Sequence, residues 1–161
     1  MTTAHAIPLS TNVSRLDKVE RVVRNFTATA ALTGAIPVPG ASVAIVAENL
    51  TMLTIISAKL GVEVTPQKVA ASWGALAIVN AIGRRLFVEG ARMLGWAAGP
   101  LGVAGISVLG ALTAALQTWV LGQLVIAIAE NGGNPLDHAA ALRLERDATL
   151  RFLRGEWRSA S

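Results

Sequence analysis

The chain alternates between segments with apolar residues at helical spacing and longer segments that are almost wholly apolar. Near the N-terminus, apolar residues at every third or fourth position predict an amphipathic helix over residues 14–32. Its apolar face consists of Leu16, Val19, Val23, Phe26 and Ala30. This helix is expected either to pack on the protein's own core or to lie in the headgroup layer of a membrane. Residues 1–13 are expected to form a flexible leader, with Ser14 and Asp17 as a cap at the helix start.

A stretch with glycine and proline residues, from Gly34 to Gly40, is expected to end this first helix. Pro37 and Pro39 remove two backbone donors and Gly40 permits a close approach, so residues 36–40 predict a rigid non-helical elbow. A mainly apolar helix is expected over residues 41–60, with Glu48 as its single acidic residue. Gly61 follows it at the position of a C-cap glycine.

A third helix is predicted from residue 66 to about residue 96, with Thr65 as its cap and Pro66 in its first turn. Arg84, Arg85 and Glu89 are interpreted as a solvated face or an interfacial anchor, with a docking site for a headgroup or a partner as the alternative. Trp73 and Trp96 lie near basic residues in the sequence, and they are interpreted as membrane-interface anchors or as core residues.

The longest apolar stretch, residues 93–129, contains no charged side chain. A break is expected at Gly99–Gly102, which leaves residues 103–129 as a segment long enough to cross a bilayer core of about 30 Å. Within it, Trp119 is expected to pack, and Gln117, Thr118 and Gln123 are expected to bond to neighbouring helices. Glycine costs about 1 kcal/mol in a helix relative to alanine. The glycines here are therefore expected to pack against another helix, in this chain or a second copy: Gly95, Gly99, Gly102, Gly105 and Gly110.

A last amphipathic helix is expected over residues 135–155, with Asn134 as its cap and Pro135 in its first turn. Its acids Glu145 and Asp147 are expected to pair with nearby arginines. The predicted fold is thus an all-α hydrophobic helical bundle of about five helices with amphipathic N- and C-terminal helices. Its parts are the leader 1–13, a hydrophobic helical domain 14–132 and a C-terminal amphipathic helix 133–161.

Composition favours a membrane setting over an ordinary soluble domain. Hydrophobic residues make up 53% of the chain and charged residues 15%, against about 25% charged residues in soluble proteins. Two amphipathic helices offer too little cover for so much apolar chain, so we expect association with a lipid membrane. A soluble cytoplasmic homo-oligomer is the alternative. The net charge of +4 is modest and spread out, which argues against a nucleic-acid partner.

Motifs that carry chemistry are missing from the sequence. There is no cysteine, and His5 and His138 lie far apart in the chain, so neither thiolate chemistry nor a zinc site is expected. The sequence has no phosphate-binding P-loop and no nucleophile elbow. We therefore expect a protein that is not an enzyme and that binds no cofactor or metal.

One part of the sequence is similar to a known bacterial family. The stretch 36–40, the apolar run to Asn49 and Met52, residues 60–62, and the later Gln117-Thr118 and Gly122 carry this resemblance. They resemble the hydrophobic helical domain of YcjF-like membrane proteins, which also occurs fused to Era/Ras-like GTPase domains. The similarity covers about residues 30–132, the family-like core being residues 33–132, and it implies a membrane setting and a link to GTPases.

Two functions follow as expectations. The first is a membrane-associated, non-catalytic scaffold or partner module that acts with a separate GTPase, located in the bacterial inner membrane. The second is a self-assembling structural or pore-forming helical protein, which the small residues around Gly95 and Gly99 favour. A homo-oligomer is also expected among the partners of the chain.

Overall fold

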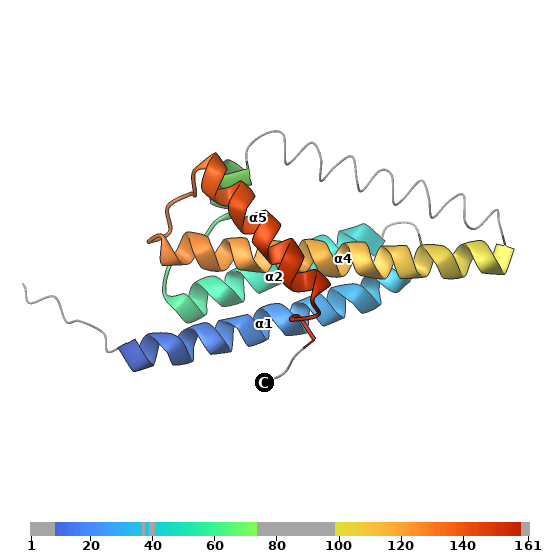
Figure 1. Ribbon diagram of the computed structural model, residues 1–161, viewed down its shortest axis with the longest axis horizontal. Coiled ribbons are helices and arrows are strands. Elements are labelled where there is room, and N and C mark those ends of the chain that lie inside the picture. The colour runs from blue at the N-terminus through green and yellow to red at the C-terminus, as the bar shows by residue number, and fades with distance from the viewer. Residues whose placement is uncertain (1–8, 37, 39–40, 74–98, 159–161) are drawn as a thin grey trace, which may run out of the picture.

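The computed structural model describes residues 9–36, 38, 41–73 and 99–158. Within these residues the chain forms helices α1 (Leu9–Ala35), α2 (Ala41–Leu60), α4 (Gly99–Glu130) and α5 (His138–Leu153), with a further helical stretch over residues 66–73 and no strand (Figure 1). The prediction of an all-α hydrophobic bundle is confirmed.

The helices form an elongated bundle around the axis of α4. α1 runs antiparallel to α4 and packs along it, α2 lies beside both, and α5 crosses α4 near the end at which α1 begins (Figure 1). The core is shared by all four helices, and its largest fully buried side chains include Val19, Met52, Ile56, Trp119 and Leu124. From α5, Phe152 joins the same cluster.

The predicted apolar face of α1 is the face that contacts this core. Val19, Val23 and Ala30 are buried, and Leu16 and Phe26 pack partly buried against the cluster. Of the two interpretations of the first helix, packing on the protein's own core is therefore the observed one.

Two glycines allow α1 and α4 to approach closely. A Cβ atom added at Gly34 would lie 2.5 Å from the carbonyl oxygen of Gly110 and 2.6 Å from the Cβ atom of Ala114. A Cβ atom added at Gly122 would overlap the side chain of Val23. The two helix backbones meet at these points because one side of each contact has no side chain.

Several predicted boundaries match the structure. α2 covers residues 41–60, Gly61 follows with a left-handed φ of 67°, and the next helical stretch begins at Pro66. The hydroxyl of Thr65 accepts a hydrogen bond from the backbone N–H of Lys68 at 3.3 Å, as a helix cap does. The rest of the predicted third helix lies outside the described residues.

The start of α1 was predicted wrongly. The helix begins at Leu9, so residues 9–13 are helical rather than part of a leader, and Ser14 lies inside the helix. Pro8 directly precedes Leu9 in the sequence. Because proline is tolerated at the start of a helix but not in its interior, Pro8 is a stronger signal for the helix start than Ser14.

The predicted break at Gly99–Gly102 is also wrong in its position. α4 begins at Gly99, whose φ of 73° is left-handed, and the helix continues through Gly102. Pro100 does not interrupt it because the first turn of a helix needs no donor from that residue.

The start of α5 lies three residues later than predicted. Asp137, not Asn134, caps the helix, because its carboxylate accepts the backbone N–H of Ala140 at 2.8 Å. The side-chain amide of Asn134 instead donates to the carbonyl of Asn131 at 3.1 Å, within the turn that precedes the helix.

Candidate functional site

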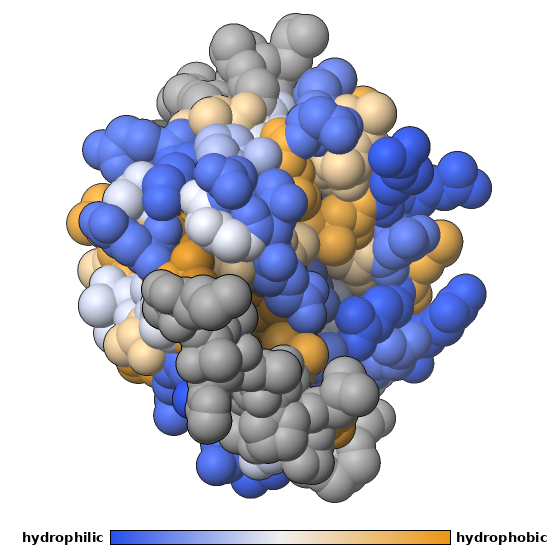
Figure 2. All heavy atoms as spheres, turned by 90° about the vertical axis from the view of Figure 1, so that its left-hand side faces the viewer, coloured by the Kyte–Doolittle hydropathy of each residue, from blue (hydrophilic) through white to orange (hydrophobic). Residues whose placement is uncertain are grey.

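Charge divides the bundle into two ends. We call residues 25–36, 41–58 and 99–118 the apolar end, because Glu48 is the only charged residue in them. The charged end comprises residues 13–24, 59–73 and 130–158. Figure 2 views the molecule from the charged end, and hydrophilic side chains cover much of that face, with hydrophobic surface between them. The bundle is therefore amphipathic along its long axis.

Large apolar side chains are exposed mainly at the apolar end. Among the described residues, eight of the twelve exposed large hydrophobic side chains lie there or at the elbow: Leu32, Ile36, Val38, Val43, Leu50, Val108, Leu109 and Leu112. Val43 is 73% exposed and Val108 is 62% exposed. A cluster of this kind is typical of a surface that contacts lipid or another protein.

Exposed hydroxyl groups at this end are bonded within their own helices. Thr51 donates to the carbonyl of Ala47 at 2.9 Å, and Thr54 donates to the carbonyl of Leu50 at 3.0 Å. A face whose donors are satisfied in this way can be surrounded by lipid without leaving polar groups unpaired.

Polar pairs join the helices inside the apolar end. The hydroxyl of Thr33 on α1 donates to Glu48 Oε1 on α2 at 2.8 Å. The hydroxyl of Thr118 on α4 donates to Asn49 Oδ1 on α2 at 2.9 Å. The expected bond from Thr118 to a neighbouring helix is thus confirmed, and Glu48 faces α1.

Two described helices are long and apolar enough to cross a membrane. They are Ala41–Leu60 and Gly102–Glu130. In the most apolar 18 residues of each helix, 28% are buried in the bundle for the first and 61% for the second. α2 therefore keeps most of its surface open, whereas α4 also serves as the core helix.

The charged end contains a polar cluster centred on Arg151 of α5. The Arg151 guanidinium donates to Glu156 Oε2 at 2.7 Å, to Gln123 Oε1 at 3.1 Å and to Glu20 Oε1 at 3.2 Å. It also lies over the ring of Trp119, 5.4 Å from the ring centroid, and the indole N–H donates to the carbonyl of Ala148 at 2.9 Å. The cluster links α1, α4 and α5.

This cluster is an arrangement of charges that stabilises the fold. Burial lowers the pKa of Arg151, but its hydrogen bonds with Glu156 and Glu20 outweigh this effect and hold the pKa above its ordinary value. A guanidinium that stays charged in this way cannot act as a general acid or base near neutral pH. We therefore assign it no catalytic role.

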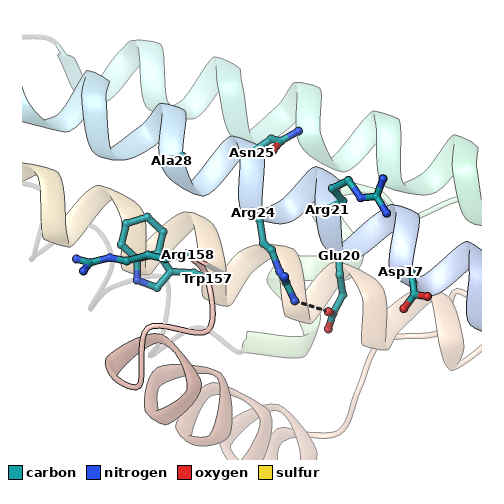
Figure 3. A pocket seen from close by; sticks show the side chains of 8 residues that line it. All are labelled: Asp17, Glu20, Arg21, Arg24, Asn25, Ala28, Trp157 and Arg158. Atoms are coloured by element: carbon teal, nitrogen blue, oxygen red, sulfur yellow. Dashed lines mark hydrogen bonds and ion pairs between the residues drawn. The ribbon is translucent and has the colours of Figure 1, made fainter. Parts of the chain in front are cut away.

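A groove opens beside this cluster, between α1 and the turn that follows α5 (Figure 3). It has a volume of about 540 Å³, and Arg21, Arg24, Trp157 and Arg158 are among the residues that line it. Its lining includes Arg24, the last charged residue of α1, and Ala28, which is one turn further along the helix.

Several predicted site residues lie outside the described residues. They are Pro37, Pro39, Gly40, Arg84, Arg85, Glu89, Gly95 and Trp96. Ile36 and Val38, which flank the first proline, are bends rather than helix. Trp73 packs partly buried against the core, and Trp119 is fully buried as expected.

The predicted helix-packing glycines have different surroundings. Gly110 contacts Gly34 of α1, whereas Gly99 and Gly105 have no described atom within 4 Å of an added Cβ. Gly102 is partly buried.

Sequence analysis missed Gly34, Glu20 and Arg151. Gly34 was assigned to the break after the first helix, and it is the glycine that contacts α4 most closely. Arg151 was one of several arginines on an amphipathic helix, and Glu145 and Asp147 were expected to pair there. Instead, neither of these acids forms an ion pair among the described residues, and Arg151 pairs with Glu20 and Glu156. The spacing of charged residues along the helix did not indicate which acids Arg151 would pair with.

Comparison with known proteins returned no relative: no family model, no curated protein and no solved structure matches this chain. The similarity to the YcjF-like hydrophobic domain stays a prediction from the sequence.

Proposed function

We propose that the protein is a membrane-associated, non-catalytic scaffold or partner module whose apolar end inserts into the bilayer and whose charged end stays in the aqueous phase. The observation that carries this proposal is the concentration of exposed, uncharged apolar surface at one end of the bundle. Water would be a poor solvent for that surface, whereas lipid can cover it, and the exposed hydroxyls of Thr51 and Thr54 are already bonded within α2.

The dimensions of the apolar end agree with this placement. Residues 99–118 of α4 would extend about 30 Å at about 1.5 Å per residue, which is the thickness of a bilayer core. The uncharged part of α1, residues 25–35, would extend only about 16 Å. α4 therefore reaches farther than the turn between α1 and α2, as Figure 1 shows for its N-terminal part. On this proposal α4 crosses the bilayer core and the α1–α2 turn lies within it.

Membrane fractionation with carbonate extraction tests the proposal. The wild-type protein should stay in the membrane pellet, and recovery in the soluble fraction without detergent would contradict the proposal. Lysine at exposed positions of α4, in Val108→Lys with Leu112→Lys, should release the protein, because lysine in a bilayer core costs about 2.5–3.5 kcal/mol. The matched control places lysine at Leu142 and Leu153, which are similarly exposed but lie at the charged end. The control should remain membrane-bound.

The GTPase partner in this proposal is supported by the sequence resemblance. The charged end, with the exposed faces of α1 and α5, would be the surface available to such a protein outside the bilayer. A GTPase gene beside this one, and co-purification of its product with this protein in mild detergent, would support the partnership. A purified neighbouring GTPase that does not bind the protein would argue against it.

A self-assembling helical protein, structural or pore-forming, is the second candidate. It is favoured by the exposed stripe of small and apolar residues on α4: Ala104, Gly105, Val108, Leu109 and Leu112. Crosslinking in mild detergent should then yield higher species that Gly105→Leu reduces without a loss of helix content. A single low-mass species for the wild type would leave the scaffold as the better proposal.

A further inference from the structure

The outer face of α5 carries exposed leucines at the charged end of the bundle. Among the described residues, three of the four exposed large hydrophobic side chains that lie outside the apolar end and the elbow are on this helix: Leu142, Leu150 and Leu153. The residues on the other side of the helix are buried in the core: Ala141, Ala148 and Phe152. The leucines are therefore directed away from the core.

The three leucines and Arg146 form one line along the helix, which we call the α5 seam. Positions 142, 146, 150 and 153 follow one another at steps of four, four and three. With about 3.6 residues per turn, they lie within about 80° of one another and extend about 17 Å along the helix. This is the spacing by which one helix packs against a second helix.

The charges on and beside the α5 seam are basic. Arg146 lies between the leucines, Arg143 and Arg154 follow one edge, and all three side chains are exposed. None of them forms an ion pair with a residue that the structure describes. The acids Glu145 and Asp147 lie farther out, about 60° beyond the two edges of the seam. A partner that covers Arg146 must supply a carboxylate, because a buried charge is costly unless it is paired.

The direction of the seam favours a protein over lipid as its partner. α5 packs on α4 through its buried face, so the seam points away from the long axis of the bundle rather than along it (Figure 1). With α4 across the bilayer core, the seam would face sideways in the aqueous phase, whereas a helix that lies on a membrane turns its apolar side toward the bilayer. A second copy of the same face would set arginine against arginine, which is unfavourable.

We propose that the α5 seam binds an acidic amphipathic helix of a partner protein. Apolar residues of that helix would pack on the three leucines, and its carboxylates would pair with Arg143, Arg146 and Arg154. The inference deepens the proposed partner module and rests on it, since insertion of the apolar end is what leaves α5 in water beside the bilayer.

Peptide binding to the full-length protein in phosphatidylcholine nanodiscs tests this chemistry. The probe is a designed helical peptide with leucines at steps of three and four and glutamates beside them, and a second peptide has lysines in place of the glutamates. By fluorescence anisotropy, wild type should bind the glutamate peptide at least about tenfold more tightly than the lysine peptide. Leu150→Ser with Leu153→Ser should weaken that binding about tenfold or more, because buried apolar anchors carry much of the affinity of an interface. Absence of binding to the glutamate peptide would overturn the proposal.

A reversal of charge separates the seam from the net charge of the protein. Arg143→Glu with Arg146→Glu should reverse the preference, so that the lysine peptide binds more tightly. Arg15→Glu with Lys18→Glu changes the net charge equally at exposed positions of α1, and this control should still prefer the glutamate peptide. A reversal in both double variants would overturn the seam as the site. Circular dichroism establishes that each variant is folded.

Spin labels distinguish the other occupants of the seam and test the proposed function separately. The chain contains no cysteine, so a nitroxide attached at Leu150→Cys reports on the seam alone. In nanodiscs that contain phosphatidylglycerol this label should be accessible to water. Shielding by lipid would assign α5 to the headgroup layer, and dipolar broadening between labels would assign the seam to a second copy; either result would overturn the proposal. A label at Val108→Cys should be shielded by lipid, and its exposure to water would overturn membrane insertion, whereas the peptide measurements decide the seam.

Discussion

Arg151 of α5 and Glu20 of α1 form an ion pair at 3.2 Å, although 131 positions of sequence separate them. The same guanidinium reaches Gln123 of α4, so one side chain connects three helices at the charged end. The described residues of the apolar end form no ion pair, and their helices are joined by packing and by two hydroxyl hydrogen bonds, from Thr33 to Glu48 and from Thr118 to Asn49.

Replacing Arg151 with methionine should lower the free energy of unfolding by about 1–2 kcal/mol. The variant leaves Glu20, Glu156 and Gln123 without this donor, and a hydrogen bond to a charged group contributes about 1.5–3 kcal/mol. The Arg151 side chain is 34% exposed, so solvent screening reduces that contribution. Chemical denaturation in detergent measures the change. Arg143→Met on the exposed face of α5 is the control and should change stability by no more than about 0.5 kcal/mol.

The contribution of Arg151 should not depend on pH in the neutral to alkaline range. Since its pKa is raised in the folded state, its stabilising effect is complete below the unfolded-state pKa and is lost only as pH rises through the folded-state value. Both values lie in strongly alkaline solution. The difference in melting temperature between wild type and Arg151→Met should therefore be constant from about pH 7 to about pH 10. A difference that shrinks within this range would contradict the assignment.

Gly34→Ala should destabilise the bundle. The added Cβ atom would lie 2.5 Å from a backbone oxygen of α4, and since backbone cannot rotate away, the helices must separate, at about 1–3 kcal/mol. Gly105→Ala is the matched control in a helix with no described atom within 4 Å of the new Cβ. It should stabilise the protein by up to about 1 kcal/mol through helix propensity. Thermal melts that rank the two variants the other way would refute the close approach of α1 and α4.

Substituting Pro37 and Pro39 with alanine should raise the helical circular dichroism signal. α1 ends at Ala35 and α2 begins at Ala41, and without the prolines the intervening residues have backbone donors that can continue a helix. A merged helix would separate Thr33 from Glu48, whose hydrogen bond needs the antiparallel arrangement. Pro66→Ala, in the first turn of a helical stretch, is the control that should leave the signal unchanged. Unchanged helicity in the double variant would count against the elbow.

Thr118 and Asn49 should be energetically coupled. Thr118→Val removes the donor of their 2.9 Å hydrogen bond, and a double-mutant cycle with Asn49→Leu should give a coupling energy of about 0.5–1.5 kcal/mol. Thr54→Val is the control, since that hydroxyl bonds only to the carbonyl of Leu50 in its own helix. It should show no coupling to Asn49, and additive effects for Thr118 and Asn49 would mean that the bond contributes nothing.

Much of the secondary structure could be predicted from the residues, because it depends on local chemistry. The apolar runs and the glycine and proline residues around them placed α2 at its observed bounds and placed a long apolar helix ending near Glu130. Where more than one residue could cap the start of a helix, the sequence alone predicted the wrong one. Asn134 and Asp137 both precede α5, and only the geometry of the turn gives Asp137 the N–H of Ala140.

Contacts between helices were decided by the tertiary structure. The register of α1 against α4 sets Gly34 opposite Gly110 and Val23 opposite Gly122, and no helical period in either segment encodes that register. Asp147 lies one turn before Arg151 on the same helix, yet Arg151 pairs with Glu20 because α5 crosses α4 beside α1. The groove lined by Arg21 and Arg158 arises in the same way. Residues distant in sequence meet only after packing has fixed the helices, so their chemistry could not be read from spacing along the chain.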